Sequence, residues 1–221
     1  MPENLRDTLV FLSDLRGNNN KQWFDQNRKR YEVAKDRFEV FVTDLISDFG
    51  AVEDLGSLSA KDCIYRINRD IRFSRDKTPY KPNMGAVIGR GGRKTIGRSY
   101  YVHIEPDGHS LIASGLYMPS SEELDKMRRS IANDSAKFKR IIQKAVFKRY
   151  FGGLEGEKLK TAPQGYPKDH PDIELLRFKQ YLVSHSLSDQ EVLSPDLTTS
   201  LVEMFKVMKP FLTYIQMALE A

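Results

Sequence analysis

Basic side chains of the kind that bind anions are concentrated in one short stretch of this chain. Residues 66–98 contain ten Lys and Arg but only two acids, a local balance of 10 − 2 = +8. The other residues carry 25 basic and 28 acidic groups, a balance of −3, so the net charge of +5 conceals one basic segment on a slightly acidic remainder. This asymmetry predicts that the segment contacts an anionic partner.

The spacing of these residues favours a folded anion-binding cup over a disordered basic tail, because Ile67, Ile71 and Phe73 are interspersed with them. Guanidinium groups bind phosphate or carboxylate oxygens through two parallel hydrogen bonds, and a nearby carboxylate, Asp70 or Asp76, can hold a guanidinium in place. A phosphorylated or otherwise anionic small molecule is the predicted ligand, and the change Arg72→Glu is predicted to abolish its binding. The cup is predicted to consist of Arg66, Arg69, Arg72, Lys77 and Lys81.

Two neighbouring features are predicted to form the rim of the cup. Tyr80 lies between two prolines that stiffen the backbone, although a position at the edge of the core fits this residue equally well. The Gly-rich stretch 89–97 carries Arg93 and Lys94 but lacks the Lys directly after its second Gly, and the following helix, that a phosphate-binding loop requires. We therefore predict a flexible basic hairpin that closes over a bound anion.

If the protein catalyses a reaction, the candidate general acid–base residues are Asp70, His103 and Glu105. A histidine beside a carboxylate is the usual material of general acid–base catalysis. In the run 100–105, strand alternation places Tyr101, His103 and Glu105 on one face and the apolar residues on the other. A solvent-facing or internally paired strand face is the competing interpretation.

The same basic residues are compatible with two other classes of function. A nucleic-acid-binding module would use them to follow a phosphate backbone and would bind with a steep salt dependence. No helix-turn-helix, zinc-finger or aromatic RNA-binding signature accompanies them. In a scaffold or interaction domain the arginines would only form salt bridges, and mutating them would change stability alone.

Composition limits the remaining possibilities. The histidines lack the paired spacing of a helix-borne zinc site, so neither a metal nor a cofactor is predicted. The single cysteine, Cys63, permits no intramolecular disulfide and lies in an apolar run, which predicts a buried strand residue rather than a nucleophile. The apolar stretches are far shorter than the roughly 20 residues of a membrane span, and the N-terminus lacks a secretory pattern. These features predict a cytoplasmic protein that does not span a membrane.

Apolar periodicity predicts the elements that must position these residues. Helical spacing is found at 4–16, 23–50, 120–131, 136–150 and from 196 onward. The run 23–50 is long enough for two helices or one bent helix, and Pro210 is predicted to kink or split the last helix. Strand alternation is found at 63–67, 84–88, 100–104, 111–116 and 180–187. Short turns between the strands favour an α+β fold. We predict a single domain, 1–221, with a mostly antiparallel sheet of about four to five strands flanked by N-terminal and C-terminal helices.

Several motifs together resemble those of a widespread family of bacterial and fungal proteins known only as a domain of unknown function. They are Phe11-Leu12 and Leu15 before Asn18-Asn19, Trp23-Phe24-x-x-Asn27-Arg28-x-x-Tyr31, Arg69-Asp-x-Arg-Phe-Ser-x-Asp-Lys-x-Pro-Tyr-Lys81, and Tyr166-Pro-Lys-Asp-His-Pro171. The resemblance spans nearly the whole chain, supports one domain and implies no activity. It adds Asn27, Arg28 and Tyr31 as secondary site candidates.

Overall fold

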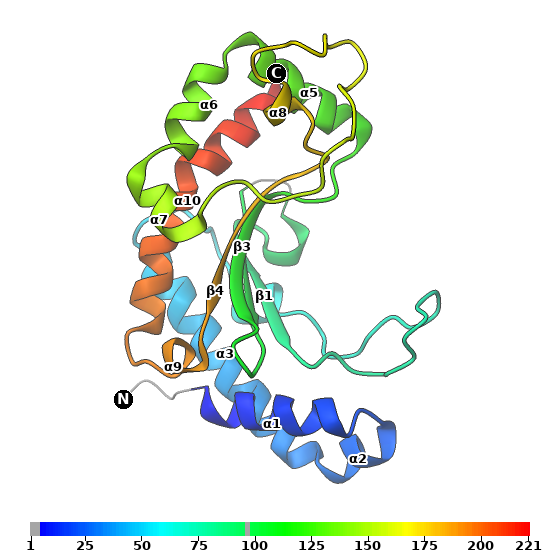
Figure 1. The fold of residues 1–221 in the computed structure, drawn as a ribbon. Coiled ribbons are helices and arrows are strands. Elements are labelled where there is room, and N and C mark those ends of the chain that lie inside the picture. The colour runs from blue at the N-terminus through cyan, green and yellow to red at the C-terminus, as the bar shows by residue number, and fades with distance from the viewer. Residues whose placement is uncertain (1–4, 96–97) are drawn as a thin grey trace. The chain divides into compact units, whose positions relative to one another are not determined.

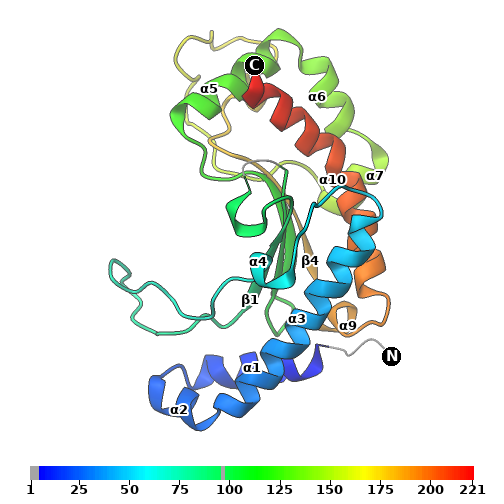
Figure 2. The same ribbon diagram turned by 180° about the vertical axis from the view of Figure 1, so that it is seen from behind.

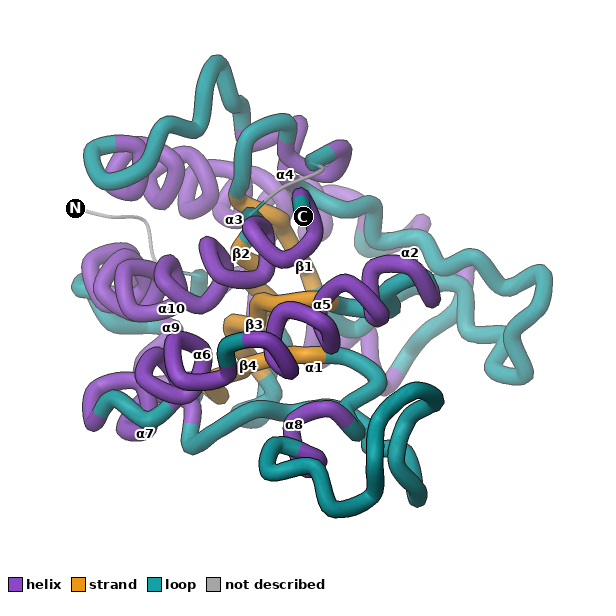
Figure 3. Tube along the Cα trace, turned by 90° about the horizontal axis from the view of Figure 1, so that it is seen from above, coloured by secondary structure: helices purple, strands orange, loops and turns teal. Residues whose placement is uncertain are grey.

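The computed structural model describes residues 5–95 and 98–221, and Figure 1 labels its helices and strands. One antiparallel sheet is formed in the order β1-β2-β3-β4 (Figure 3). Its strands are β1 Met84–Ile88, β2 Tyr100–Ile104, β3 Ser110–Leu116 and β4 Tyr181–Leu187. The predicted α+β fold with a mostly antiparallel sheet is confirmed. The start of the N-terminus, residues 1–4, and residues 96–97 of the predicted hairpin lie outside the described residues.

Helices lie before β1 and after β4 in the chain, as predicted, and α5 to α8 lie between β3 and β4. Those before β1 are α1 Arg6–Gly17, α2 Lys21–Gln26, α3 Arg28–Gly50 and α4 Ala60–Cys63. A short 3-10 helix, η1 Gly92–Lys94, follows β1. Later helices are α5 Ser121–Asn133, α6 Ser135–Ile142, α7 Ala145–Phe151, α8 Ile173–Leu176, α9 Asp189–Val192 and α10 Leu197–Glu220. Pro210 lies inside α10, which continues through it as one helix. Among the described residues, no helix has both the length and the apolar character needed to cross a membrane.

The chain contacts divide the molecule into two compact units. The first unit contains the described residues up to Ile112 together with Ser186–Glu203. The second contains Ala113–His185 and Met204–Ala221. The predicted single domain stays a prediction.

In the first unit α1 packs on α3 because each helix presents apolar side chains at intervals of three and four residues. The buried Thr8 hydroxyl donates to the Ala34 carbonyl at 2.9 Å, which joins the two helices by a hydrogen bond. The predicted helical run from residue 23 is indeed two helices, α2 and α3, which meet at Asn27. Asn20 begins α2, since its side-chain oxygen accepts the Trp23 N–H at 2.9 Å.

The two faces of β2 differ as strand alternation predicts. Tyr100, Val102 and Ile104 are fully buried, whereas Tyr101 and His103 are only partly covered. β2 pairs with β1 in a register that places His103 opposite Gly85 and Tyr101 opposite Val87. One face of this strand pair therefore belongs to the core, and the other carries polar side chains.

The predicted strand at 63–67 is wrong in its first part, because Cys63 ends the short helix α4. Ser59 and Asp62 form a capping box there, and these side-chain hydrogen bonds satisfy the helix start that alternation alone does not reveal. The chain then becomes extended, and Ile64 forms a single bridge with Ala86 of β1. Cys63 is buried as predicted, and burial raises the pKa of its thiol to about 11. A neutral, buried thiol is a poor nucleophile.

In the second unit, aromatic side chains of α10 and β4 pack against Phe138 of α6. Its ring lies 4.8 Å from that of Tyr214 and 6.1 Å from that of Phe211, both on α10. β3 and β4 approach closely at Gly115, where φ is +134° and a Cβ would lie 2.1 Å from the Tyr181 carbonyl oxygen. Only glycine fits this backbone position without a shift.

Candidate anion-binding groove

Part of the basic segment forms an arm whose two ends are joined by backbone hydrogen bonds and whose middle is a loop. The Arg69 N–H donates to the Pro79 carbonyl at 2.9 Å, and the Lys81 N–H donates to the Ile67 carbonyl at 2.8 Å. Between these bonds the chain runs out and back, and Figures 1 and 2 show it projecting from the connection between α4 and β1. This arm, residues 67–81, carries most of the predicted cup.

Three cations on the arm, Arg69, Arg72 and Lys77, are bound by groups of the arm itself. The Arg72 guanidinium holds Asp70 with two bonds, Nε to Oδ1 at 2.9 Å and Nη2 to Oδ2 at 2.6 Å. Arg69 pairs with Asp76 and donates to the Thr78 hydroxyl at 2.6 Å. Lys77 Nζ donates to the Ile71 carbonyl at 3.0 Å. The two acids thus offset the charge of two of the predicted cup arginines.

Asp76 organises the tip of the arm. Its Oδ1 accepts the Thr78 N–H at 2.9 Å and the Thr78 hydroxyl at 2.8 Å. The backbone hydrogen bond from Thr78, followed by the hydrogen bond from Arg69, lowers the pKa of Asp76 to about 2 from 3.8. The ionised carboxylate is therefore the form that the folded arm prefers.

We expect the arm to loosen as acid protonates Asp76. Because the folded pKa lies below the unfolded value, the ionised carboxylate contributes fully above about pH 4 and loses its effect as pH falls through about 2. Hydrogen exchange of the Thr78 amide should therefore quicken, relative to its intrinsic rate, across that window. In the variant Asp76→Ala the amide should be weakly protected at every pH. A protected amide in this variant, or a flat profile in the wild type, would contradict the assignment.

Arg66 and Arg93 line a second feature, a groove in the first unit with a volume of about 270 Å³. Four cations, Lys35, Lys61, Arg66 and Arg93, surround it with one acid, Glu39. The other residues that line the groove are Tyr31, Phe38, Ile64, Tyr65, Ile67 and Met84. We call this feature the basic groove.

Three of the basic-groove cations differ from the arm arginines in their surroundings. Lys35, Lys61 and Arg66 are exposed, and none has an ion-pair partner among the residues that the structure describes. Arg93 is held in place by backbone carbonyls, donating from Nε to Asp62 and from Nη2 to Lys61 at 3.1 Å each. A guanidinium has five N–H donors, so Arg93 keeps donors for a ligand.

The elements around the basic groove explain how distant residues meet there. Tyr31, Lys35 and Phe38 lie on one face of α3, at spacings of four and three residues. Burial raises the pKa of Tyr31, which keeps its phenol protonated and able to donate a hydrogen bond. The Arg66 segment is fixed by Lys81, whose Nζ donates to the Arg66 carbonyl at 3.0 Å.

Other predicted site residues have structural contacts outside the basic groove. Tyr80 is only 6% exposed, and its ring stacks on Phe24 with centroids 4.0 Å apart. Asn19 exchanges two hydrogen bonds with the Tyr80 backbone, at 2.9 and 3.1 Å. Asn27 donates to the Trp23 carbonyl at 2.9 Å, and Arg28 pairs with an aspartate of α2 at 3.1 Å. Lys94 is exposed on η1. Lys81 is not in the lining but contacts it, because its Nζ lies 5.6 Å from the ring centroid of Tyr65. Burial lowers the pKa of Lys81.

The predicted pair His103 and Glu105 is part of a longer hydrogen-bonded chain. His103 Nε2 lies 2.7 Å from Glu105 Oε2, and its Nδ1 lies 3.1 Å from the Tyr101 hydroxyl. A carboxylate only accepts hydrogen bonds, so His103 Nε2 is the donor to Glu105. Arg16 of α1 donates to Glu105 Oε1 at 2.9 Å. Sequence reasoning missed Arg16, which lies 89 residues before Glu105 in the chain. Asp70, the third predicted acid–base residue, pairs with Arg72 on the arm and does not join this chain of hydrogen bonds.

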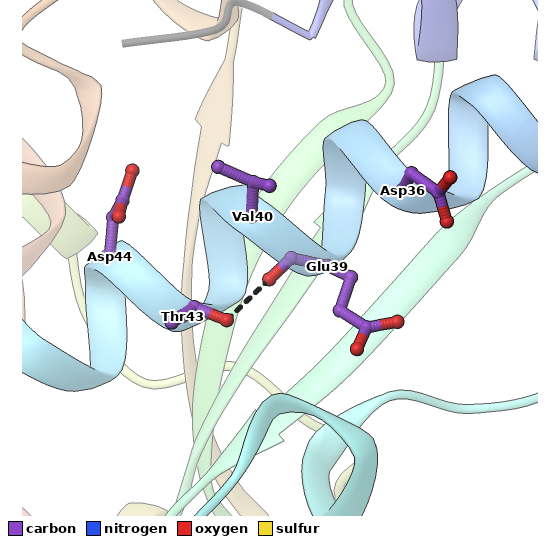
Figure 4. A pocket seen from close by; sticks show the side chains of 5 residues that line it. All are labelled: Asp36, Glu39, Val40, Thr43 and Asp44. Atoms are coloured by element: carbon purple, nitrogen blue, oxygen red, sulfur yellow. Dashed lines mark hydrogen bonds between the residues drawn. The ribbon is translucent and has the colours of Figure 1, made fainter.

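A further hollow lies along α3 and is shown in Figure 4. Its lining comes from one helix, and the carboxylates of Asp36, Glu39 and Asp44 point in different directions. The Thr43 hydroxyl donates to the Glu39 carbonyl at 2.8 Å, which is a contact within the helix. Among the described residues no group of three or more His, Cys, Asp or Glu could hold a metal ion. This hollow does not assemble a site.

Comparison with known proteins gives one match. The model of the family described as conserved hypothetical protein (DUF2461) matches residues 7–214. No curated protein and no solved structure matches.

Proposed function

Since this chain belongs to the DUF2461 family of conserved hypothetical proteins, whose description names no activity, we propose a function from its own residues. The protein binds a small phosphorylated or similarly anionic ligand in the basic groove. The observation that carries this proposal is the gathering of four cations around one cavity with a single carboxylate. Buried Cys63 is compatible with a reducing cytoplasm as the place where the protein works.

The chemistry of the lining supports an anion with an organic part. Arg66 and Arg93 supply guanidinium groups, which suit the paired oxygens of a phosphate, and Lys35 and Lys61 supply compact charges. Ile64 and the rings of Tyr31 and Tyr65 add accessible apolar surface, so a bare inorganic ion would leave part of the groove unused. Typical ligand pockets measure about 300–1,000 Å³, and the volume of about 270 Å³ therefore favours a small phosphate ester over a dinucleotide.

A nucleic-acid ligand is less well supported, because it would need cations arranged along a track. On the arm, Arg69 and Arg72 are paired with Asp76 and Asp70, which weakens their attraction for further phosphates. These ion pairs favour the scaffold interpretation for the arm itself. They do not extend to Lys35, Lys61 or Arg66 in the basic groove.

Thermal unfolding with candidate ligands tests the proposal. Sugar phosphates, nucleoside monophosphates, inorganic phosphate and a short oligonucleotide should each be added at low and at moderate salt. A ligand at a hundred times its Kd stabilises the folded state by about 2.7 kcal/mol. At roughly 2–4 °C per kcal/mol, the melting temperature should rise by about 5–11 °C.

The pattern of shifts separates the three functions. A shift from one small phosphate ester that persists at moderate salt supports the basic groove. An oligonucleotide shift that fades with salt, by about 0.9 log units of affinity per log unit of salt for each duplex phosphate contacted, supports nucleic-acid binding instead. No shift with any of these compounds overturns anion binding and leaves the scaffold function.

A further inference from the structure

A second groove lies in the second unit, where α6 runs beside the C-terminal part of α10 (Figures 1 and 2). Its volume is about 490 Å³. On the α10 side the lining extends from Lys206 to Met217, which is eleven residue steps or about 16 Å of helix at 1.5 Å per step. This interhelical groove shares no residue with the basic groove.

Cations lie on both sides of the interhelical groove, and its described lining contains no acid. Lys137, Arg140 and Lys144 come from α6 and the residue that precedes α7, at spacings of three and four. Lys206 and Lys209 come from α10. Arg140 and Lys144 are exposed and have no ion-pair partner among the described residues.

Between these two rows of charge the lining is apolar. Met217 is 52% exposed, Pro210 is exposed and Ile141 is half-buried. Lys137 Nζ lies 3.8 Å from the Met217 sulfur, which brings the cationic side of the groove next to its apolar part. The aromatic ring in the lining, Tyr214, is only 5% exposed and its hydroxyl accepts a hydrogen bond from Ser130.

We propose that the interhelical groove binds an acidic amphipathic helix of a partner protein. A helix of about three turns matches the length of the lining, and its apolar face would cover Met217, Pro210 and Ile141. Acidic side chains flanking that face would meet the cations on both sides, which is the charge complementarity that orients a partner. Nucleic acid fits less well, because base stacking requires an exposed aromatic ring and Tyr214 is covered.

The test uses the full-length protein and a designed peptide of about 18 residues, with Leu at helical spacing and Glu on both flanks. An isomer of identical composition distributes the leucines around the helix. Binding is measured by fluorescence anisotropy of the labelled peptides and of a single-stranded oligonucleotide of similar charge. We expect the amphipathic peptide to bind about tenfold more tightly than its isomer.

Three variants locate the binding. Arg140→Glu/Lys144→Glu should weaken binding about tenfold, because two attractive contacts become repulsive. Met217→Gln should weaken it severalfold, because it removes apolar contact without changing charge. The matched control Arg129→Glu/Lys168→Glu changes two exposed cations outside the groove and should leave the affinity unchanged.

Four results with the peptides would overturn the proposal, and so would one with the oligonucleotide. They are no binding of the amphipathic peptide, equal binding of its isomer, insensitivity to Met217→Gln, and equal loss in the Arg129→Glu/Lys168→Glu control. Preferential binding of the oligonucleotide would assign the groove to nucleic acid. None of these variants changes a residue of the basic groove, so each should still bind a small phosphate ester if the proposed function is correct. Peptide binding and phosphate binding therefore test the two proposals separately.

Discussion

The double variant Lys61→Glu/Arg66→Glu should bind the small phosphorylated ligand about a hundredfold more weakly than the wild type, because two charge-assisted contacts are lost and two repulsive charges are gained. Both side chains are exposed and without ion-pair partners among the described residues, so the fold should be preserved. Calorimetric titration gives the affinity, and circular dichroism checks the fold.

Matched variants separate a local effect from one of net charge. Lys29→Glu/Arg75→Glu changes the total charge equally at two exposed residues outside the basic groove, and binding should stay within a fewfold of the wild type. Arg72→Glu examines the cup predicted from the sequence. Because Arg72 is already bound to Asp70, we expect ligand binding to survive this change. Loss of binding in Arg72→Glu with retention in Lys61→Glu/Arg66→Glu would move the site from the basic groove to the arm.

The variant Gly115→Ala should destabilise the second unit by about 3 kcal/mol, from a strained positive φ together with overlap of the new methyl group and the Tyr181 carbonyl. The methyl group would lie 2.1 Å from that oxygen, so β3 and β4 must move apart or the backbone at residue 115 must change its conformation. Urea unfolding measures the change, and the melting temperature should fall by about 6–12 °C.

Gly153→Ala is the appropriate control because a Cβ there meets no atom within 4 Å and no positive φ is involved. Its stability should remain within about 0.5 kcal/mol of the wild type. If Gly115→Ala were tolerated equally well, the close approach of the two strands would not be required for stability.

Local patterns in the sequence predict most of the elements, because alternation and helical spacing record which side chains are buried. The strand pattern at 100–104 is an example, with its buried and polar faces confirmed. The pattern at 63–67 failed at its start because a capping box from Ser59 and Asp62 outweighs a short alternating run.

The site is harder to predict because its parts come from distant segments. Arg66, Arg93 and Tyr31 were candidates from the sequence and do line the basic groove. Lys35 and Lys61 were not, since each looks like an ordinary surface lysine until the chain folds. Conversely, Tyr80 stands among cations in the sequence, but its ring packs on Phe24, which lies 56 residues earlier and carries no local signal of that contact.

The position of the arm also bears on solubility. β1 is an edge strand of the sheet, and such a strand exposes N–H and C=O groups that can pair with another molecule and start aggregation. The chain entering the arm covers part of it, through the bridge from Ile64 to Ala86 and the bond from the Tyr65 N–H to the Gly85 carbonyl. The arm that follows carries charged side chains and Pro79, which discourage strand addition. The residues that lead into the arm thus occupy backbone groups of β1 that would otherwise be open to strand addition.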